Sequence, residues 1–240
     1  MGEQVPERFL DAMRRGVKRL AAHEPLQYVI GEWDFRFLTL KCDKRALIPR
    51  PETEGLVSLV LKHLEKREGV PFVVDVGTGT GAIILSLAKE LKREAILLGS
   101  DVSEDAIALA RENAARTGLE GKVKFVAMDG LDDFDEPGLI DVIVSNPPYI
   151  KTSVCETLDR RVKDYEPRLA LDGGASGLDF YDRYLADALN LLRPGGAVFF
   201  EIGDDQGDDL RKLFAAYGFE QAEIGKDLAG KDRYASAILP

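Results

Sequence analysis

Residues 141–150 combine an apolar run with a loop that is rich in hydrogen-bond acceptors. The run is typical of a buried parallel strand, and Asn146-Pro147-Pro148-Tyr149 follows it directly. Two prolines remove two backbone donors, so the loop must leave the sheet with carbonyl groups that have no ladder partners. These carbonyls, the Asn146 side-chain oxygen and the Tyr149 ring could together bind an NH₂ group and its planar substituent. A proline-rich turn with a chance Asn and Tyr is the alternative.

A glycine-rich turn joins an expected strand at residues 72–76 to an expected helix that runs to about residue 91. The turn consists of Gly77, Thr78, Gly79, Thr80 and Gly81. Glycine lets the backbone approach a ligand closely, and the amino terminus of a helix attracts negatively polarised groups. We therefore expect a nucleotide-like cofactor at the end of this strand.

Two acidic residues bear on the identity of that cofactor. Asp101 ends the next expected strand, at residues 95–100, and can accept hydrogen bonds from two ribose hydroxyls. With the glycine spacing it also fits a dinucleotide fingerprint, in which an acid follows about 20 residues later. Asp75 favours a nucleotide that bears an amino acid instead, because its carboxylate could hold a cationic amino group. The NH₂-binding loop likewise favours group transfer over hydride transfer.

Composition narrows the possible classes of protein. The chain has 240 residues, 45% of them hydrophobic, which is enough for one main domain with a large core. We find neither a run of about 18 apolar residues nor a basic start followed by an apolar region, and so expect a cytoplasmic protein without a membrane span. The formal net charge of −10 disfavours direct nucleic-acid binding.

Cysteine and histidine are too sparse to suggest a disulfide framework or a metal site. The chain has Cys42, Cys155, His23 and His63, and their spacing matches no metal-ligand pattern. A basic cluster follows the Asn-Pro-Pro-Tyr loop, and it is either a docking surface or a solvated face. Its members are Lys151, Arg160, Arg161, Lys163 and Arg168.

Periodicity predicts three segments. Residues 1–24 contain an amphipathic helix, and residues 25–48 alternate in a way that indicates a β-hairpin, with Trp33, Phe35 and Phe37 on one side. Residues 49–240 form the catalytic domain, which begins with a helix after Pro51 and repeats strand and helix before a terminal hairpin.

Several motifs together resemble the HemK/PrmC family of protein-(glutamine) methyltransferases, which use S-adenosylmethionine. The resemblance runs from about Glu24 to the end of the sequence. Its motifs are Arg50-Pro-Glu-Thr-Glu54, Asp75-Val-Gly-Thr-Gly-Thr-Gly-Ala82, Asp101-Val-Ser103, Asn146-Pro-Pro-Tyr149, Glu166-Pro-Arg-Leu-Ala-Leu171, Gly173 to Leu178, Leu192-Arg-Pro-Gly-Gly196, Glu201-Ile-Gly203 and Asp227-Leu-Ala-Gly230 with Asp232-Arg233. Asn-Pro-Pro-Tyr alone also occurs in adenine amino-methyltransferases, whereas the first and last motifs are more specific.

The resemblance implies an α/β fold with a seven-stranded Rossmann-like sheet whose last strand is antiparallel. It implies methylation of the glutamine in the Gly-Gly-Gln motif of peptide-chain release factors. The family's cofactor-binding positions correspond to Gly77 to Gly81, Asp101, Gly130 and Asn146, and Asn146 to Tyr149 would hold the glutamine. Arg50 would help to close the loop over the substrate. Family members usually carry several helices before the position of Pro25, where this sequence has about one, so we expect the catalytic domain to make most of the release-factor contact.

The expected chemistry follows from the amide. Its nitrogen is a poor nucleophile, and hydrogen bonds to the Asn146 oxygen and the Pro147 carbonyl would orient its lone pair without a strong general base. The alternatives are a glutamine methyltransferase that acts on a ribosomal protein, an adenine amino-methyltransferase, a dinucleotide oxidoreductase, and a non-catalytic module that binds the cofactor.

Overall fold

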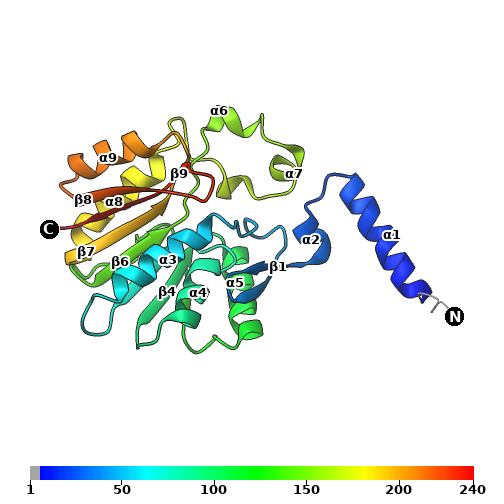
Figure 1. Cartoon of the computed structure of the whole chain (residues 1–240), viewed down its shortest axis with the longest axis horizontal. Coiled ribbons are helices and arrows are strands. Elements are labelled where there is room, and N and C mark those ends of the chain that lie inside the picture. The colour runs from blue at the N-terminus through cyan, green and yellow to red at the C-terminus, as the bar shows by residue number, and fades with distance from the viewer. Residues whose placement is uncertain (1–5) are drawn as a thin grey trace.

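The computed structural model describes residues 6–240, which form a seven-stranded sheet with helices on both faces, preceded by a small helical and hairpin region (Figure 1). The helices are α1 (Glu7–Ala21), α2 (Leu26–Ile30), α3 (Thr53–Leu64), α4 (Ala82–Glu90), α5 (Glu104–Thr117), α6 (Thr152–Cys155), α7 (Arg160–Lys163), α8 (Asp179–Leu191) and α9 (Gly207–Ala216). The strands are β1 (Glu32–Phe35), β2 (Leu38–Lys41), β3 (Phe72–Val76), β4 (Ile96–Asp101), β5 (Lys124–Ala127), β6 (Ile140–Ser145), β7 (Leu192–Glu201), β8 (Glu220–Lys226) and β9 (Asp232–Ile238).

The strand order of the large sheet is β5-β4-β3-β6-β7-β9-β8. Neighbours from β5 to β7 are parallel, whereas β9 is antiparallel to both β7 and β8. This confirms the predicted Rossmann-like sheet with its antiparallel last strand. Because β3 and β6 lie side by side at its centre, the two loops that the sequence singled out leave the same edge of the sheet.

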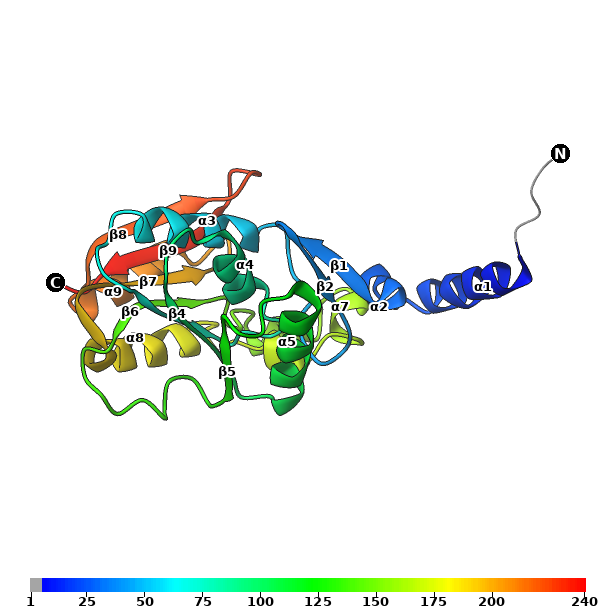
Figure 2. The ribbon, with the colours of Figure 1, turned by 90° about the horizontal axis from the view of Figure 1, so that it is seen from below.

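Alternating residues of the central strands pack into two hydrophobic layers. Val73 and Val142 face a cluster that includes side chains of α3, α4 and α5. Val74 and Ile143 face a second cluster, which includes side chains of α8 and α9. Figure 2 shows α3 and α8 on opposite sides of the strands. Coverage on both faces explains why the central strands read as continuous apolar runs.

The amino-terminal region differs in part from the prediction. The predicted helix is α1, which projects from the rest of the chain, and none of its side chains from Glu7 to Ala21 is buried (Figure 1). The predicted hairpin is shorter than expected, because residues 26–30 form α2. Pro25 precedes that helix, and Gly31 ends it with a left-handed φ of 87°. Phe37 was predicted to share one side of the hairpin with Trp33 and Phe35, but it lies in the β1–β2 turn and is 72% exposed, whereas Phe35 is buried.

Candidate active site

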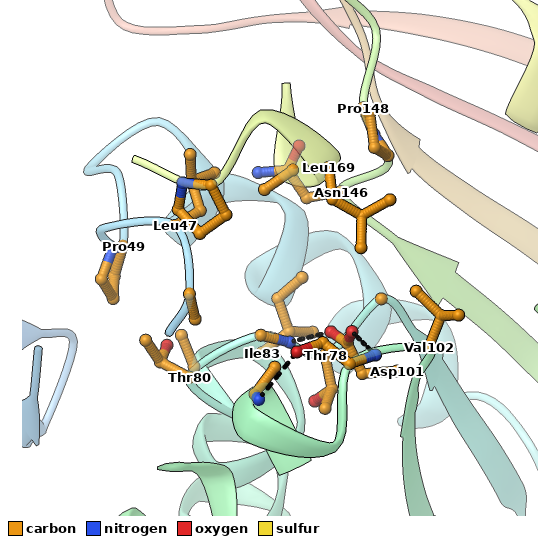
Figure 3. Close-up of a pocket in the computed structure, with 18 of the residues that line it drawn as sticks. Leu47, Pro49, Thr78, Thr80, Ile83, Asp101, Val102, Asn146, Pro148 and Leu169 are labelled. Atoms are coloured by element: carbon orange, nitrogen blue, oxygen red, sulfur yellow. Dashed lines mark hydrogen bonds between the residues drawn. The ribbon is translucent and has the colours of Figure 1, made fainter. Parts of the chain in front are cut away.

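A cavity opens at the edge where the parallel strands end. Its lower wall is the glycine-rich turn with the residues that follow β4, and its upper wall carries Asn146, Pro148 and Leu169 (Figure 3). Further lining residues come from the segments before α3 and before α8, from the residues after β5, and from α8 itself. Those that the sequence had predicted are Arg50, Gly77, Thr78, Gly79, Thr80, Asp101, Gly130, Asn146 and Pro148. One cavity therefore joins both candidate sites.

The glycine turn brings backbone to the cavity wall. Gly77 and Gly79 have φ values of 72° and 54°, a region that side chains disfavour. Gly81 has a φ of 81° and directly precedes α4, but it does not line the cavity. The turn thus leaves room for a ligand at the amino terminus of α4.

Asp101 is held beside the turn by two backbone donors. Its Oδ2 accepts from the Gly79 N–H and its Oδ1 from the Ser103 N–H, each at 2.9 Å. Burial raises the pKa of Asp101, and the two backbone bonds oppose that shift. Each oxygen retains a lone pair for a ribose hydroxyl. The adjacent Val102 is 49% exposed on the cavity wall, where it offers an apolar surface to a planar base. The two acceptor oxygens of Asp101 fit the ribose, and the apolar side chain of Val102 fits the base, of an adenosine cofactor.

Asp75 has a different position from the one predicted. Its side chain is fully buried, is absent from the cavity lining, and accepts a bond from Thr78 Oγ1 at 2.6 Å. Burial raises the pKa of Asp75 to about 7. The residue therefore supports the turn from beneath, and an amino group in the cavity would meet Thr78 before it reached Asp75.

The Asn-Pro-Pro-Tyr loop follows β6, in which every residue is buried. Asn146 and Pro148 line the cavity across from Asp101 (Figure 3). Pro147 and Tyr149 are not among the lining residues. Not all of the loop's carbonyls are free as predicted, because the Tyr149 carbonyl accepts from Gln206 Nε2 at 3.2 Å. Among residues 6–240, no hydrogen bond is donated to the Pro147 carbonyl.

Two residues that the sequence reading missed lie behind this loop. Asn146 Nδ2 donates to Thr53 Oγ1 at 3.2 Å, and Thr53 donates to Glu201 Oε2 at 2.5 Å. The Tyr149 hydroxyl donates to Glu201 Oε1 at 3.4 Å. Burial raises the pKa of Glu201, and the bond from Thr53 opposes that shift. A single acid within the apolar run of β7 was the available signal for this contact.

Arg50 joins the cavity to the segment between β6 and α8. Its guanidinium pairs with Glu166 Oε1 at 2.5 Å, and Glu166 Oε2 accepts from the Ile48 backbone N–H at 3.1 Å. Glu166 is buried, so this pair ties the loop before α3 to the segment that carries α6 and α7. The role of Arg50 in closing the loop over the substrate stays a prediction.

The predicted basic cluster is partly neutralised within its own segment. Arg160 pairs with Asp164 at 2.9 Å, and Arg168 pairs with Asp172 at 3.2 Å and also with Glu156. Lys151, Arg161 and Lys163 are exposed and form no ion pair with any described residue, although Lys163 Nζ donates to the Glu156 carbonyl at 2.9 Å. Of the five cluster members, Lys151 and Arg161 therefore have neither an ion pair nor a hydrogen bond donated by the side chain to another described residue.

Two further properties bear on the predictions. No group of three or more His, Cys, Asp and Glu side chains in the described range is placed to hold a metal ion. None of the helices between residues 6 and 240 is both long and apolar enough to cross a membrane.

Sequence comparison finds extensive similarity to curated proteins. The Methyltransferase small domain family matches residues 56–174. The release factor glutamine methyltransferase of Agrobacterium fabrum is 42% identical over 90% of this chain and 75% of its own length. The protein of the same name from Moorella thermoacetica is 43% identical over 91% of this chain and 76% of its own length.

Structure comparison shows that solved methyltransferases share the fold of this chain. The N-terminal domain of human METTL16, solved in complex with SAH, superposes with a TM-score of 0.62 over 92% of this chain and 83% of that one, at 19% identity. A methyltransferase from Pyrococcus furiosus superposes with a TM-score of 0.59 over 95% of this chain and 97% of that one, also at 19% identity.

Proposed function

The chain belongs to the release factor glutamine methyltransferases, and we propose that it methylates the side-chain amide nitrogen of the glutamine in the Gly-Gly-Gln motif of peptide-chain release factors. The observation that carries the proposal is the position of Asn146. Its amide nitrogen is bonded to Thr53 and its side chain lines the cavity, so its oxygen is available to an NH₂ group.

The cofactor is S-adenosylmethionine, which supplies an electrophilic methyl group when bound. Asp101 would accept the ribose hydroxyls, and Val102 would contact the adenine. The backbone of Gly77 to Gly79 would approach the amino-acid portion, with Thr78, Thr80 and Gly130 on the surrounding wall. These assignments use the lower wall of the cavity and leave Asn146 and Pro148 on the opposite wall for the substrate.

The residues of the loop act on the substrate's amide. Its nitrogen is weakly nucleophilic because the lone pair is delocalised into the carbonyl. Asn146 Oδ1 and the Pro147 carbonyl would accept its two N–H bonds, which orients the lone pair toward the cofactor side of the cavity and stabilises the positive charge that develops on nitrogen. A methylated, protonated amide is strongly acidic, so water can accept its proton without a dedicated base.

The test is methyl transfer from labelled S-adenosylmethionine to a purified release factor, followed by peptide mapping. We expect one methyl group on the glutamine of the Gly-Gly-Gln motif and no transfer to a release factor in which this glutamine is alanine. A ribosomal-protein fraction and an adenine-containing oligonucleotide serve as competing substrates. Transfer to either of them in preference to the release factor would contradict the proposal.

A further inference from the structure

Glu201 is a buried acid that the proposed reaction does not use. It is 2% exposed and ends β7, whose preceding residues Val198 to Phe200 are buried and apolar. A carboxylate in such surroundings carries a large desolvation cost, which an apolar residue of similar size would avoid. Its Oε2 accepts from the Thr53 hydroxyl and its Oε1 from the Tyr149 hydroxyl. The carboxylate therefore contacts two of the segments that form the substrate side of the cavity.

The carboxylate determines which way the Thr53 hydroxyl points. An ionised Glu201 has no proton to donate, so the single proton of the Thr53 hydroxyl lies in the 2.5 Å bond to Oε2. The Thr53 oxygen can then only accept from Asn146, and only the NH₂ side of the Asn146 amide can donate. The bond at 3.2 Å is thus compatible with a single orientation of the amide, with Nδ2 toward Thr53 and Oδ1 away from it.

We propose that Thr53 and Glu201 are positioning residues that hold Asn146 in the one amide orientation that presents an acceptor to the substrate's NH₂ group. The proposal rests on the function proposed above. We call this chain of hydrogen bonds, from Asn146 to Thr53 to Glu201, the relay. Without it the Asn146 amide could rotate by half a turn, and its NH₂ group would then face the N–H groups of the substrate glutamine. Two facing donors cannot form a hydrogen bond, so the rotated state is unproductive.

Tyr149 extends the relay to the other end of the loop. Its hydroxyl donates to the second oxygen of the same carboxylate, so Glu201 restrains both Asn146, through Thr53, and Tyr149 directly. The prolines between them are already restricted in φ. The relay therefore accounts for three motifs of the sequence at once: the threonine of Arg50 to Glu54, the loop itself, and the acid of Glu201 to Gly203.

The experiment compares Thr53→Val, Thr53→Ser and Glu201→Gln with wild type. Valine keeps the shape of threonine and removes the hydroxyl, serine keeps the hydroxyl, and glutamine can donate to Thr53 and so permits the opposite relay direction. Thr39→Val is the matched control, because the Thr39 hydroxyl also donates to a carboxylate, that of Asp34 at 2.7 Å, and both residues are exposed on the β1–β2 hairpin. Calorimetry gives the affinity for S-adenosylmethionine, and single-turnover methylation of a release factor gives the rate.

We expect Thr53→Val and Glu201→Gln to lower the single-turnover rate by roughly tenfold or more, with cofactor affinity changed by less than about threefold. Thr53→Ser should retain most of the wild-type rate, and Thr39→Val all of it. If Thr53→Val loses its cooperative unfolding transition, Thr53→Ala takes its place with the same expectations. Wild-type rates in both the Thr53 and Glu201 variants would overturn the proposal.

A double-mutant cycle separates positioning from a direct role. If Thr53 acts only through Asn146, then Thr53→Val should not lower the single-turnover rate any further in the Asn146→Ala background. Full additivity of the two losses would overturn the relay. An inactive wild type in the same assay would instead contradict the proposed function, so the two failures are distinguishable.

Discussion

At the scale of single residues, the side chains proposed to bind the cofactor and the substrate lie on opposite walls of the cavity. Asp101 lies below, fixed by two backbone N–H groups, and Asn146 lies above, fixed through Thr53 (Figure 3). Because the two side chains share no hydrogen-bond partner, their contributions should be nearly independent. Cofactor affinity and methyl-transfer rate should therefore respond to different substitutions.

Asn146→Ala should lower the single-turnover rate by roughly 10²-fold, the scale seen when one preorganised polar contact is lost. Cofactor affinity should fall much less, because the glycine turn and Asp101 remain. Asn146→Asp keeps an acceptor oxygen and should retain more activity than alanine, although it loses the donor to Thr53. Equal single-turnover rates for wild type and Asn146→Ala would show that the loop is only a turn.

Asp101→Ala should have the complementary effect. It removes an acceptor of two ribose hydroxyls, and hydrogen bonds to a charged group contribute about 1.5 to 3 kcal/mol each, so affinity for S-adenosylmethionine should fall at least roughly tenfold. Asp105→Ala is the control, since Asp105 is a nearby exposed acid in the first turn of α5. Titration calorimetry that gave both variants the wild-type affinity would remove Asp101 from the cofactor site.

At the scale of elements, the segment between β6 and α8 forms one side of the cavity mouth. It carries α6 and α7, contributes Pro167 and Leu169 to the lining, and is fastened to the loop before α3 by Arg50 and Glu166. Lys151 and Arg161 belong to this segment, and both are exposed and form no ion pair with any residue in 6–240. A protein substrate whose glutamine reaches Asn146 must pass close to it.

Reversal of these two charges should slow association with the release factor. Lys151→Glu with Arg161→Glu should lower kcat/KM for the protein substrate several-fold at low salt, and the difference should shrink as salt screens the charges. Lys66→Glu with Lys92→Glu makes the same charge change on exposed residues beyond the carboxyl ends of α3 and α4, at the opposite edge of the sheet. Equal kinetics for the two double variants would mean that the segment is only a solvated face.

Sequence patterns predicted most elements because buried strands and amphipathic helices have distinct periods. The Ser103 cap and the Gly118 stop of α5 are examples in which a local signal was sufficient, and both are confirmed. The helix at residues 26–30 was missed because five residues are too few to show a helical period. The contact between Thr53 and Glu201 was missed for another reason: 148 positions separate them, and no spacing rule links side chains across that distance.

At the scale of the whole molecule, the core contains an acid whose ionisation opposes folding. Asp75 is fully buried under the glycine turn, and its pKa is raised from 3.8 to about 7. Well below pH 3.8 the carboxyl is protonated in both the folded and the unfolded chain. As pH rises from there toward 7 the unfolded chain ionises first, so the free energy of unfolding falls. Above pH 7 this contribution is constant.

Asp75→Asn should remove that dependence. We expect the free energy of unfolding of wild type, relative to Asp75→Asn, to fall by on the order of 4 kcal/mol between pH 4 and pH 7. Asparagine can still accept from Thr78, and any packing cost that it brings is the same at every pH. Urea unfolding of both proteins at several pH values measures the difference. If the free energies of unfolding of the two proteins changed equally with pH, the folded protein would have an ionised Asp75 over this whole pH range.

The position of β9 has a consequence for biosynthesis. This strand follows β8 in the chain but lies between β7 and β8 in the sheet, where Tyr234 pairs with Glu201. The Tyr234 hydroxyl also donates to the Glu52 carbonyl at 2.5 Å, one residue before Thr53. A ribosome that makes this protein must therefore deliver β9 before the carboxylate behind Asn146 has its strand neighbour and the start of α3 its brace. A nascent chain that ends before Tyr234 would contain every residue that lines the cavity. It would still lack the strand that pairs with β7 and the hydroxyl that binds the Glu52 carbonyl.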